Sequence, residues 1–511
     1  MRPAQLYLIS VLTAACAAWA ADNAEPRPAG RTEPQGATPW DQKYFVNPPL
    51  KCIEPYRRIN SFPVMAWCFH GQKVKGYAPY DEEYATNAKA AGFNVLVDDE
   101  KMLEPCRKAG GIQVVVPTFR HSPDRLRERV FKPLGDPASL MGFMLDDNRA
   151  GVMQDVVATA AWMKTDYPHL APFVSQNPAP QEQSKTDLRI FGTHNYAFMQ
   201  TGGRRARQAY CQRLDFDRGC CNAWSMAQWP VFGGTNTPSE YRFQVMAALA
   251  YGAQGVIYFA YTPHRGQLWR PPGNDYIKMA CDVNTYARKV LGRHVWGTRC
   301  TGVFHTDSGS DVPASALPPG VDQFVRNMDE ALLAGILVVE NRFDPDPLKR
   351  VVPDYVMVVD KRTGRIQEPS ERATWIALAP EIPVVEILDR DAAGHGAIRK
   401  IGPGRLVLLK LNAGDGVLLL ANPKGLDKVL GSEQAASLYA GLAATLAALP
   451  QDAKAAPPDA VKQADQLKGM LNEAVKAGKV AKPQADAVMQ HLTATINAIA
   501  ALAAKPAAKP Q

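Results

Sequence analysis

The chain has 511 residues, of which 46% are hydrophobic and 21% charged, a composition that supports large buried cores and excludes a disordered or fibrous protein. Its formal net charge is +8, but Lys and Arg are mixed with Asp and Glu along the whole length. Nucleic-acid binding favours a clustered basic stripe with interleaved aromatic residues, which this sequence lacks. We therefore expect a globular protein of two or three domains without a nucleic-acid partner.

The first twenty residues have the features of an export signal. A single charge, Arg2, precedes an apolar run that ends in Ala18-Trp19-Ala20, which fits a signal peptide with an A-x-A cleavage site. The alternative is a lipoprotein anchored at Cys16. Residues 21–45, rich in Pro, Gly and Ala, then predict a disordered leader. Neither the signal nor any later stretch is long enough for a membrane span, so we expect a secreted or periplasmic protein.

Between residues 46 and 300, eight short apolar runs alternate with segments of helical periodicity. Parallel strands need crossover connections, usually helices, so eight such repeats predict an α/β fold, the (β/α)8 TIM barrel. An open doubly wound sheet is the alternative, but no G-x-G-x-x-G follows the first run. The predicted strands are 62–69, 93–97, 112–117, 140–145, 170–175, 188–192, 222–227 and 255–260.

Two further regions follow the predicted barrel. Strand-like runs separated by turns over residues 301–430 predict an antiparallel β-sandwich domain. Residues 431–511 form an Ala-rich tail in which Leu467 and Leu471 share one helical face, and Leu492 and Ile496 share another. We expect a C-terminal helical hairpin there, with a role in packing or in contact with a protein partner.

The cysteines favour disulfides over metal binding. Beyond Cys16 there are eight more, an even set in an exported chain, so some pairing is expected although the connectivity stays open. No C-x2-C pair recurs at the spacing of a zinc site. We expect neither a metal nor another cofactor.

Active sites of TIM barrels lie on the loops at the carboxyl ends of the strands, which selects the candidate residues. These residues combine hydroxyl, amide, imidazole and carboxylate groups with flat rings, which suits stacking on sugars and hydrogen bonding to their hydroxyl groups. The predicted carbohydrate-binding residues are Asp98, Asn148, Asn177, His194, Asn195, Tyr196, Gln228, Trp229 and Tyr261.

Two aspartates at the end of the fourth strand are the catalytic candidates. A buried apolar run leads directly into Asp146 and Asp147, and glycoside cleavage needs a protonated acid beside the leaving oxygen. Adjacent carboxylates repel each other, so one of them can retain its proton near neutral pH. Asp147 is the leading acid. The structural alternative is that Asp146 points away from the lumen and caps the next helix.

The run Gly142-Phe143-Met144-Leu145-Asp146-Asp147-Asn148 resembles the strand-four signature G-[YF]-x-L-x-D-E of exported barrel proteins related to family 42 β-galactosidases. Residues 240–259 are similar to the last helix and eighth strand of those proteins, and 191–196 to the end of their sixth strand. The resemblance implies a glycoside hydrolase. However, Asn148 replaces the glutamate acid/base of those relatives, and the predicted seventh strand offers no carboxylate nucleophile, so a retaining double displacement is not supported.

Two other functions are compatible with these departures. The Asp146-Asp147 pair is similar to the arrangement in substrate-assisted hexosaminidases, in which the acetamido group of the sugar attacks. Alternatively, the site has lost its chemistry and only binds carbohydrate. A third possibility is an extracytoplasmic scaffold whose helical tail meets a partner. We predict a glycoside hydrolase-like enzyme that acts on a poly- or oligosaccharide.

Overall fold

The structure is a computed structural model that describes residues 44–68, 80–118, 122–147, 154–176, 183–200, 203–233, 237–259, 275–306, 324–346, 349–364, 369–390, 397–449 and 455–503. The predicted signal peptide, most of the leader, Asn148, Asn177 and Tyr261 lie outside these residues. Within them, no helix combines the length and apolarity that crossing a membrane requires.

The N-terminal part is a closed barrel of eight parallel strands in sequential order, which confirms the predicted fold class. Its strands are short, apolar and buried, as expected when helices cover the outer face of a parallel sheet. They are β1 (Val64–Trp67), β2 (Val95–Val97), β3 (Gln113–Pro117), β4 (Leu140–Asp147), β5 (Ala171–Gln176), β6 (Ile190–Asn195), β7 (Ala227–Gly233) and β8 (Val256–Phe259).

Helices connect the barrel strands, and their termini carry the expected signals. The Asp81 side chain accepts a hydrogen bond from the Tyr84 N–H at the start of α2, and Gly92, with φ +84°, follows the end of that helix. The helical segments are α2 (Glu82–Ala90), η1 (Glu100–Met102), α3 (Leu103–Ala109), α4 (Pro123–Leu126), η2 (Arg127–Phe131), α5 (Lys132–Leu134), α6 (Gln154–Asp166), α8 (Ala197–Gln200), α9 (Gly203–Ala223), α10 (Pro238–Ala250), α11 (Asp275–Tyr286), η3 (Ala287–Leu291) and α12 (Gly292–Val295).

Two strands differ from the prediction in a way that matters for the site. Residues 222 and 223 end α9, and β7 begins only at Ala227, where the predicted seventh strand stops. Pro230 lies inside β7, although proline cannot donate a hydrogen bond within a sheet. Similarly, β6 continues through Asn195 rather than ending at Gly192. Residues expected on loops therefore lie within strands.

The second domain is an antiparallel β-sandwich, as predicted. A three-stranded sheet, β10-β13-β16, faces a six-stranded sheet, β15-β14-β17-β12-β11-β9, and an apolar core fills the space between them. The strands are β9 (Thr298–Phe304), β10 (Val325–Met328), β11 (Leu332–Val339), β12 (Tyr355–Asp360), β13 (Arg372–Leu378), β14 (Val384–Arg390), β15 (Ala397–Pro403), β16 (Val407–Leu411) and β17 (Gly416–Ala421), with the short turn η4 (Glu340–Arg342) after β11.

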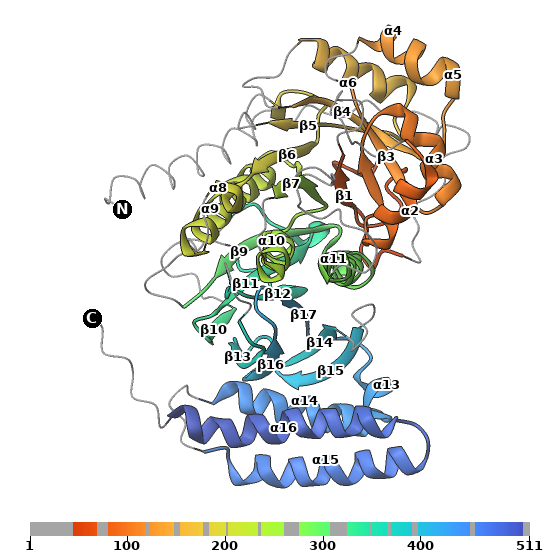
Figure 1. Cartoon of the computed structure of the whole chain (residues 1–511). Helices are drawn as coiled ribbons and strands as arrows, with labels where there is room; N and C mark the ends of the chain where they lie inside the picture. The colour runs from red at the N-terminus through yellow and green to blue at the C-terminus, as the bar shows by residue number, and fades with distance from the viewer. Residues whose placement is uncertain are drawn as a thin grey trace, which may run out of the picture.

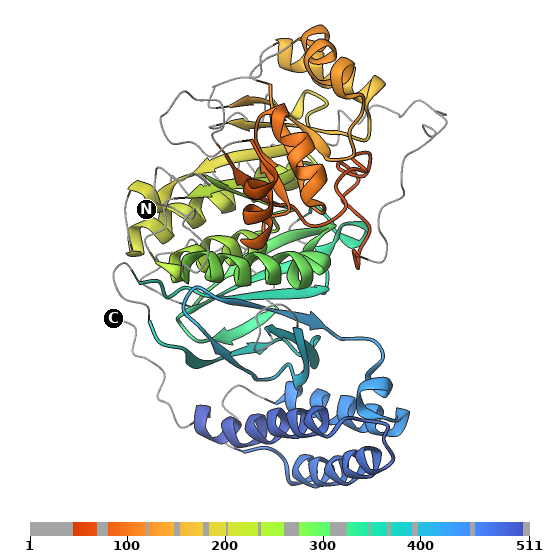
Figure 2. The ribbon, with the colours of Figure 1, turned by 45° about the vertical axis from the view of Figure 1, so that its right-hand side comes forward.

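The Ala-rich tail is helical, as predicted. The short α13 (Leu426–Leu430) precedes three long helices, α14 (Glu433–Ala448), α15 (Pro458–Lys476) and α16 (Lys482–Ala503). Helices α15 and α16 form the expected hairpin. Together the tail helices form a layer that packs on the sandwich through β14, β15 and β16. Barrel, sandwich and helical layer are thus stacked along one direction, and the turned view shows the same order (Figure 1, Figure 2).

Helix α10 lies at the junction between barrel and sandwich. It contacts β11, β12 and β17 on one side and β7 of the barrel on the other. Every residue from Tyr241 to Ala250 except Arg242 is buried. One continuous hydrophobic cluster therefore includes barrel residues and sandwich residues such as Leu333 and Met357.

The described part of the chain does not contain the disulfides that the sequence led us to expect. Cys52, Cys68, Cys106, Cys221, Cys281 and Cys300 are all thiols. Most of them are buried in apolar surroundings, where a thiol packs as a small hydrophobic group. Burial raises the pKa of Cys106 to about 12, which disfavours the reactive thiolate.

Candidate active site

Asp147 is the last residue of β4 and points into the barrel. It pairs in register with Ser175 of β5, and its side chain is 19% exposed. Asp146 precedes it in the same strand, so its side chain points to the opposite face, where it is buried at 3% exposure. The Asp146 Oδ1 accepts a hydrogen bond of 2.9 Å from the Asp147 N–H. Only Asp147 of this pair can therefore meet a substrate in the barrel mouth.

His194 of β6 is the partner of Asp147. Its Nε2 lies 2.9 Å from the Asp147 Oδ1, and its side chain is only 5% exposed. This separation suits an ion pair, but the ring N–H is not aligned on the carboxylate, and both atoms lack a hydrogen-bond partner among the described residues. The two side chains therefore face each other while each keeps hydrogen-bonding capacity for a third group.

Ser175 supplies the next polar atom of the site, and the sequence analysis did not single it out. It lies on β5 between Asp147 of β4 and Gly192 of β6, and it faces the same side of the sheet as both. Its hydroxyl is fully buried and has no hydrogen-bond partner among the described residues. Buried hydroxyl groups are normally paired, so this one indicates a place for a bound polar group. The signal in the sequence was a serine near the end of an otherwise apolar strand.

Three aromatic rings form the wall of this site, which we call the aromatic cup. Tyr196 stacks on His194 with ring centroids 5.1 Å apart, and it is also 5.1 Å from Phe259. Trp67 meets His194 and Phe259 edge-on at 6.1 and 5.6 Å. Burial, and to a lesser degree the charge of Asp147, raise the pKa of Tyr196, so its phenol stays neutral. The cup combines flat apolar faces with polar groups, as carbohydrate sites do.

Four predicted binding residues lie outside the aromatic cup. The Asn195 Nδ2 donates to the Tyr210 carbonyl (2.9 Å), and the Gln228 Nε2 reaches the Leu214 carbonyl (3.5 Å), so both face α9 on the outer side of the barrel. Trp229 faces the lumen but is fully buried deeper in the barrel, against Phe173. Alternation along β6 and β7 explains these positions.

The fourth of these residues, Asp98, also points outward. Its Oδ1 accepts a hydrogen bond of 2.8 Å from the Asp99 N–H, and its charge acts on Cys68 and on Cys106 of α3. The side chain is buried at 1% exposure between β2 and the covering helices. Asp98 therefore does not line the mouth as predicted.

A second acidic group follows β2. Burial, together with the neighbouring charge of Glu100, raises the pKa of Asp99. Burial acts in the same direction on Glu100, but its hydrogen bonds and its ion pair with Arg129 outweigh burial and lower the pKa of Glu100. The Asp99 Oδ1 caps η1 by accepting from the Lys101 N–H (3.1 Å). These contacts give both carboxylates structural roles. Over the described residues, no group of three or more His, Cys, Asp or Glu side chains is arranged to hold a metal ion.

Comparison with known proteins does not assign the chain to a family. No family model matches the chain, and no curated protein does. Among solved structures it is similar to the noncanonic maltogenic alpha-amylase AmyB from Thermotoga neapolitana, with 9% identity, coverage of 71% of this chain and 99% of that chain, and a TM-score of 0.41. It is also similar to a GH30 endoxylanase from Clostridium papyrosolvens C71, with 12% identity, coverage of 71% of this chain and 97% of that chain, and a TM-score of 0.32.

The carboxyl transferase domain of Rhizobium etli pyruvate carboxylase also matches, with 10% identity, coverage of 46% of each chain and a TM-score of 0.29. Barrels of this kind host unrelated chemistries, and at these TM-scores the likeness carries no argument about function. The function must therefore be argued from the aromatic cup itself.

Proposed function

We propose that this protein is a glycoside hydrolase-like enzyme that acts on a poly- or oligosaccharide outside the cytoplasm, with Asp147 as its acid/base group. The observation that carries the proposal is the Asp147 carboxylate at the carboxyl end of β4, 2.9 Å from His194 and inside a cup of three aromatic rings. The extracytoplasmic location rests on the signal-like residues 1–20.

Each residue of the cup has a role in this proposal. Asp147 donates a proton to the glycosidic oxygen as the bond to the leaving sugar breaks. His194 is a positioning residue whose ring lies 2.9 Å from the Asp147 carboxylate and limits where the carboxyl can lie. Ser175 and the free Nε2 face of His194 bind a hydroxyl group of the sugar, or the attacking water. Tyr196 and Phe259, the two partly exposed rings of the cup, stack on the apolar face of a sugar ring, and the buried Trp67 supports Phe259.

The second group of the reaction does not come from the predicted carboxylates. Asp98 and Asp146 both point away from the cup, so neither can act as a nucleophile close to Asp147. A retaining double displacement needs two carboxyl groups about 5–5.5 Å apart. We therefore propose attack by water or by a group of the sugar itself. A hexosaminidase-like reaction would have to use Asp147 without Asp146.

One alternative is a barrel that binds carbohydrate without cleaving it, because Asp147 is the only carboxylate that the described residues place in the cup. The aromatic cup would serve binding equally well in that case. The two functions differ in whether the unmodified protein shows turnover at all.

The test uses the full-length protein and a panel of polysaccharides and aryl glycosides. We expect the parent protein to cleave at least one of them. Asp147→Asn should lower kcat by about 100-fold or more, as loss of a general acid does, while glycan binding measured by calorimetry is retained. Asp187→Asn, which removes only an exposed ion pair with Lys164, is the matched control and should keep full activity.

Binding without any turnover by the parent protein would select the alternative. Equal activity of Asp147→Asn and the parent protein would reject the assignment of Asp147.

A further inference from the structure

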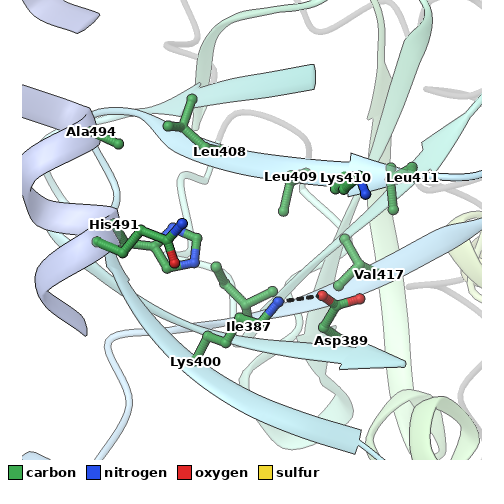
Figure 3. A pocket seen from close by; sticks show the side chains of 11 residues that line it. Ile387, Asp389, Lys400, Leu408, Leu409, Lys410, Leu411, Val417, His491 and Ala494 are labelled. Atoms are coloured by element: carbon green, nitrogen blue, oxygen red, sulfur yellow. Dashed lines mark hydrogen bonds and ion pairs between the residues drawn. The ribbon is translucent and has the colours of Figure 1, made fainter. Parts of the chain in front are cut away.

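The structure contains a cavity of about 260 Å³ far along the chain from the barrel mouth, between the sandwich and the helical layer. Strands β14 to β17 form its floor and walls, and α16 closes one side (Figure 3). Its volume lies just below the roughly 300–1,000 Å³ of sites for drug-sized ligands and above the ~150 Å³ cavity that holds benzene. A ligand of intermediate size would therefore fit.

Most of the cavity wall is apolar. Leu409, Leu411 and Val417 come from the core between the two sheets, and Ile387 lies beside them. Ala494 adds a small side chain from α16. The cavity is thus an opening into the sandwich interior, where an apolar body would be removed from water. Among the described residues no Phe, Tyr or Trp lines it, which distinguishes it from the aromatic cup and disfavours a sugar ring as its ligand.

The polar part of the wall contains two lysines and one carboxylate, Asp389. Lys410 is 72% exposed and paired with Glu371 (3.0 Å), so Lys400 is the cation that remains for a ligand. Asp389 is already satisfied, because it accepts from the Lys400 Nζ (2.7 Å) and from the Arg390 N–H (2.9 Å). An ammonium group has three donors, so Lys400 keeps two for another acceptor.

His491 and Gln490 of α16 provide further hydrogen-bonding groups beside Lys400, as Figure 3 shows for His491. Burial, and secondarily the charge of Lys400, lower the pKa of His491, so the ring is neutral and can both donate and accept. An acceptor with negative charge suits this set best, since Lys400 is only 28% exposed and its charge is partly shielded from solvent.

We propose that this cavity binds a small amphipathic monocarboxylate, such as a medium-chain fatty acid, with its carboxylate on Lys400 and its apolar body against Ile387, Leu409 and Val417. The site is independent of the aromatic cup, so it goes beyond the proposed glycosidase activity. The limited volume favours a free short acid over the long acyl chains of a membrane lipid.

The test measures binding of sodium octanoate, octan-1-ol and sodium acetate to the full-length protein by calorimetry. Octanoate should bind with a stoichiometry of one. Octanol, which has the same apolar body without the charge, should bind at least tenfold more weakly, and acetate should show no saturable binding. Lys400→Gln should weaken octanoate binding at least tenfold and leave octanol binding unchanged.

A second variant tests the cavity rather than the charge. Ala494→Phe places a ring into the cavity from α16 and should abolish binding of both octanoate and octanol. Lys482→Gln removes the Lys482–Asp486 ion pair on the same helix, outside the cavity, and is the matched control. Near-ultraviolet circular dichroism confirms that each variant is folded. The absence of octanoate binding to the parent protein, or octanoate binding that Ala494→Phe leaves unchanged, would overturn the proposal.

Discussion

Asp217 gives a prediction about stability that can be worked out in numbers. This carboxylate lies on α9, fully buried against the barrel, and it accepts a hydrogen bond of 2.5 Å from Thr193, the neighbour of His194 on β6. Burial raises the pKa of Asp217 from 3.8 to about 6, although the ion pair with Arg213 and the hydrogen bond from Thr193 act in the other direction. The folded protein therefore holds this proton more tightly than the unfolded chain does.

The direction of the pH effect follows from this difference. Below about pH 4 the carboxyl is protonated in both states, and its contribution to stability is fully present. Between pH 4 and 6 the unfolded chain releases the proton first, so stability is lost as the pH rises. A shift of about two pKa units at about 1.4 kcal/mol per unit corresponds to a loss of ~3 kcal/mol by pH 7.

Asp217→Asn removes this titration while its side-chain oxygen can still accept the hydrogen bond from Thr193. We expect the free energy of unfolding of the parent protein, relative to the variant, to fall by about 3 kcal/mol between pH 4 and 7. Urea unfolding followed by tryptophan fluorescence at pH 4, 5, 6 and 7 measures this difference. Asp124→Asn, at a side chain that is 89% exposed, controls for the loss of a surface carboxyl group.

A difference between parent and Asp217→Asn that stays constant with pH would refute the reasoning. A difference of the opposite sign would show that the ion pair with Arg213 outweighs burial.

Two further predictions concern the barrel. Ser175→Ala should lower kcat/KM about tenfold without loss of stability, because the hydroxyl has no hydrogen-bond partner among the described residues. Ser139→Ala is the contrast, because it breaks a buried hydrogen bond to the Leu103 carbonyl oxygen and should lower stability in thermal unfolding by about 1 kcal/mol. Unchanged kinetics of Ser175→Ala would remove Ser175 from the site. Gly142→Ala would place a Cβ 2.0 Å from the Ala171 carbonyl oxygen of the next strand, so it should lower the free energy of unfolding by about 3 kcal/mol or prevent folding. Gly219→Ala on α9 is the control, because its Cβ meets open space, and it should be neutral or stabilising by up to about 1 kcal/mol. A stable Gly142→Ala protein would contradict the close approach of β4 and β5.

The order of helices and strands could be predicted because apolar periodicity is local. Each strand of the barrel is a short apolar run between helical segments, and this pattern survives errors of a few residues at each end. The position of Asp147 at the mouth followed directly, since the apolar run of β4 leads without interruption into the carboxylates.

The side-chain directions could not be predicted in the same way. An error of one residue in a strand reverses which face each side chain meets. Asn195 and Gln228 were expected on loops, but β6 and β7 extend through them and turn both toward α9. Ser175 was missed for the converse reason, because a buried serine draws attention only when its neighbours are known to leave it unpaired.

Helix α10 has a consequence for how the protein can be divided. The buried residues of α10 belong to one hydrophobic cluster with side chains of the barrel and of the sandwich. Either domain alone would therefore expose apolar side chains at that junction. The barrel and the sandwich should consequently melt in a single transition, and a recombinant barrel cut before β9 would expose a broad apolar face and aggregate. We therefore expect the two architectures to fold as one unit, and exchange of either for another module to require a matched α10.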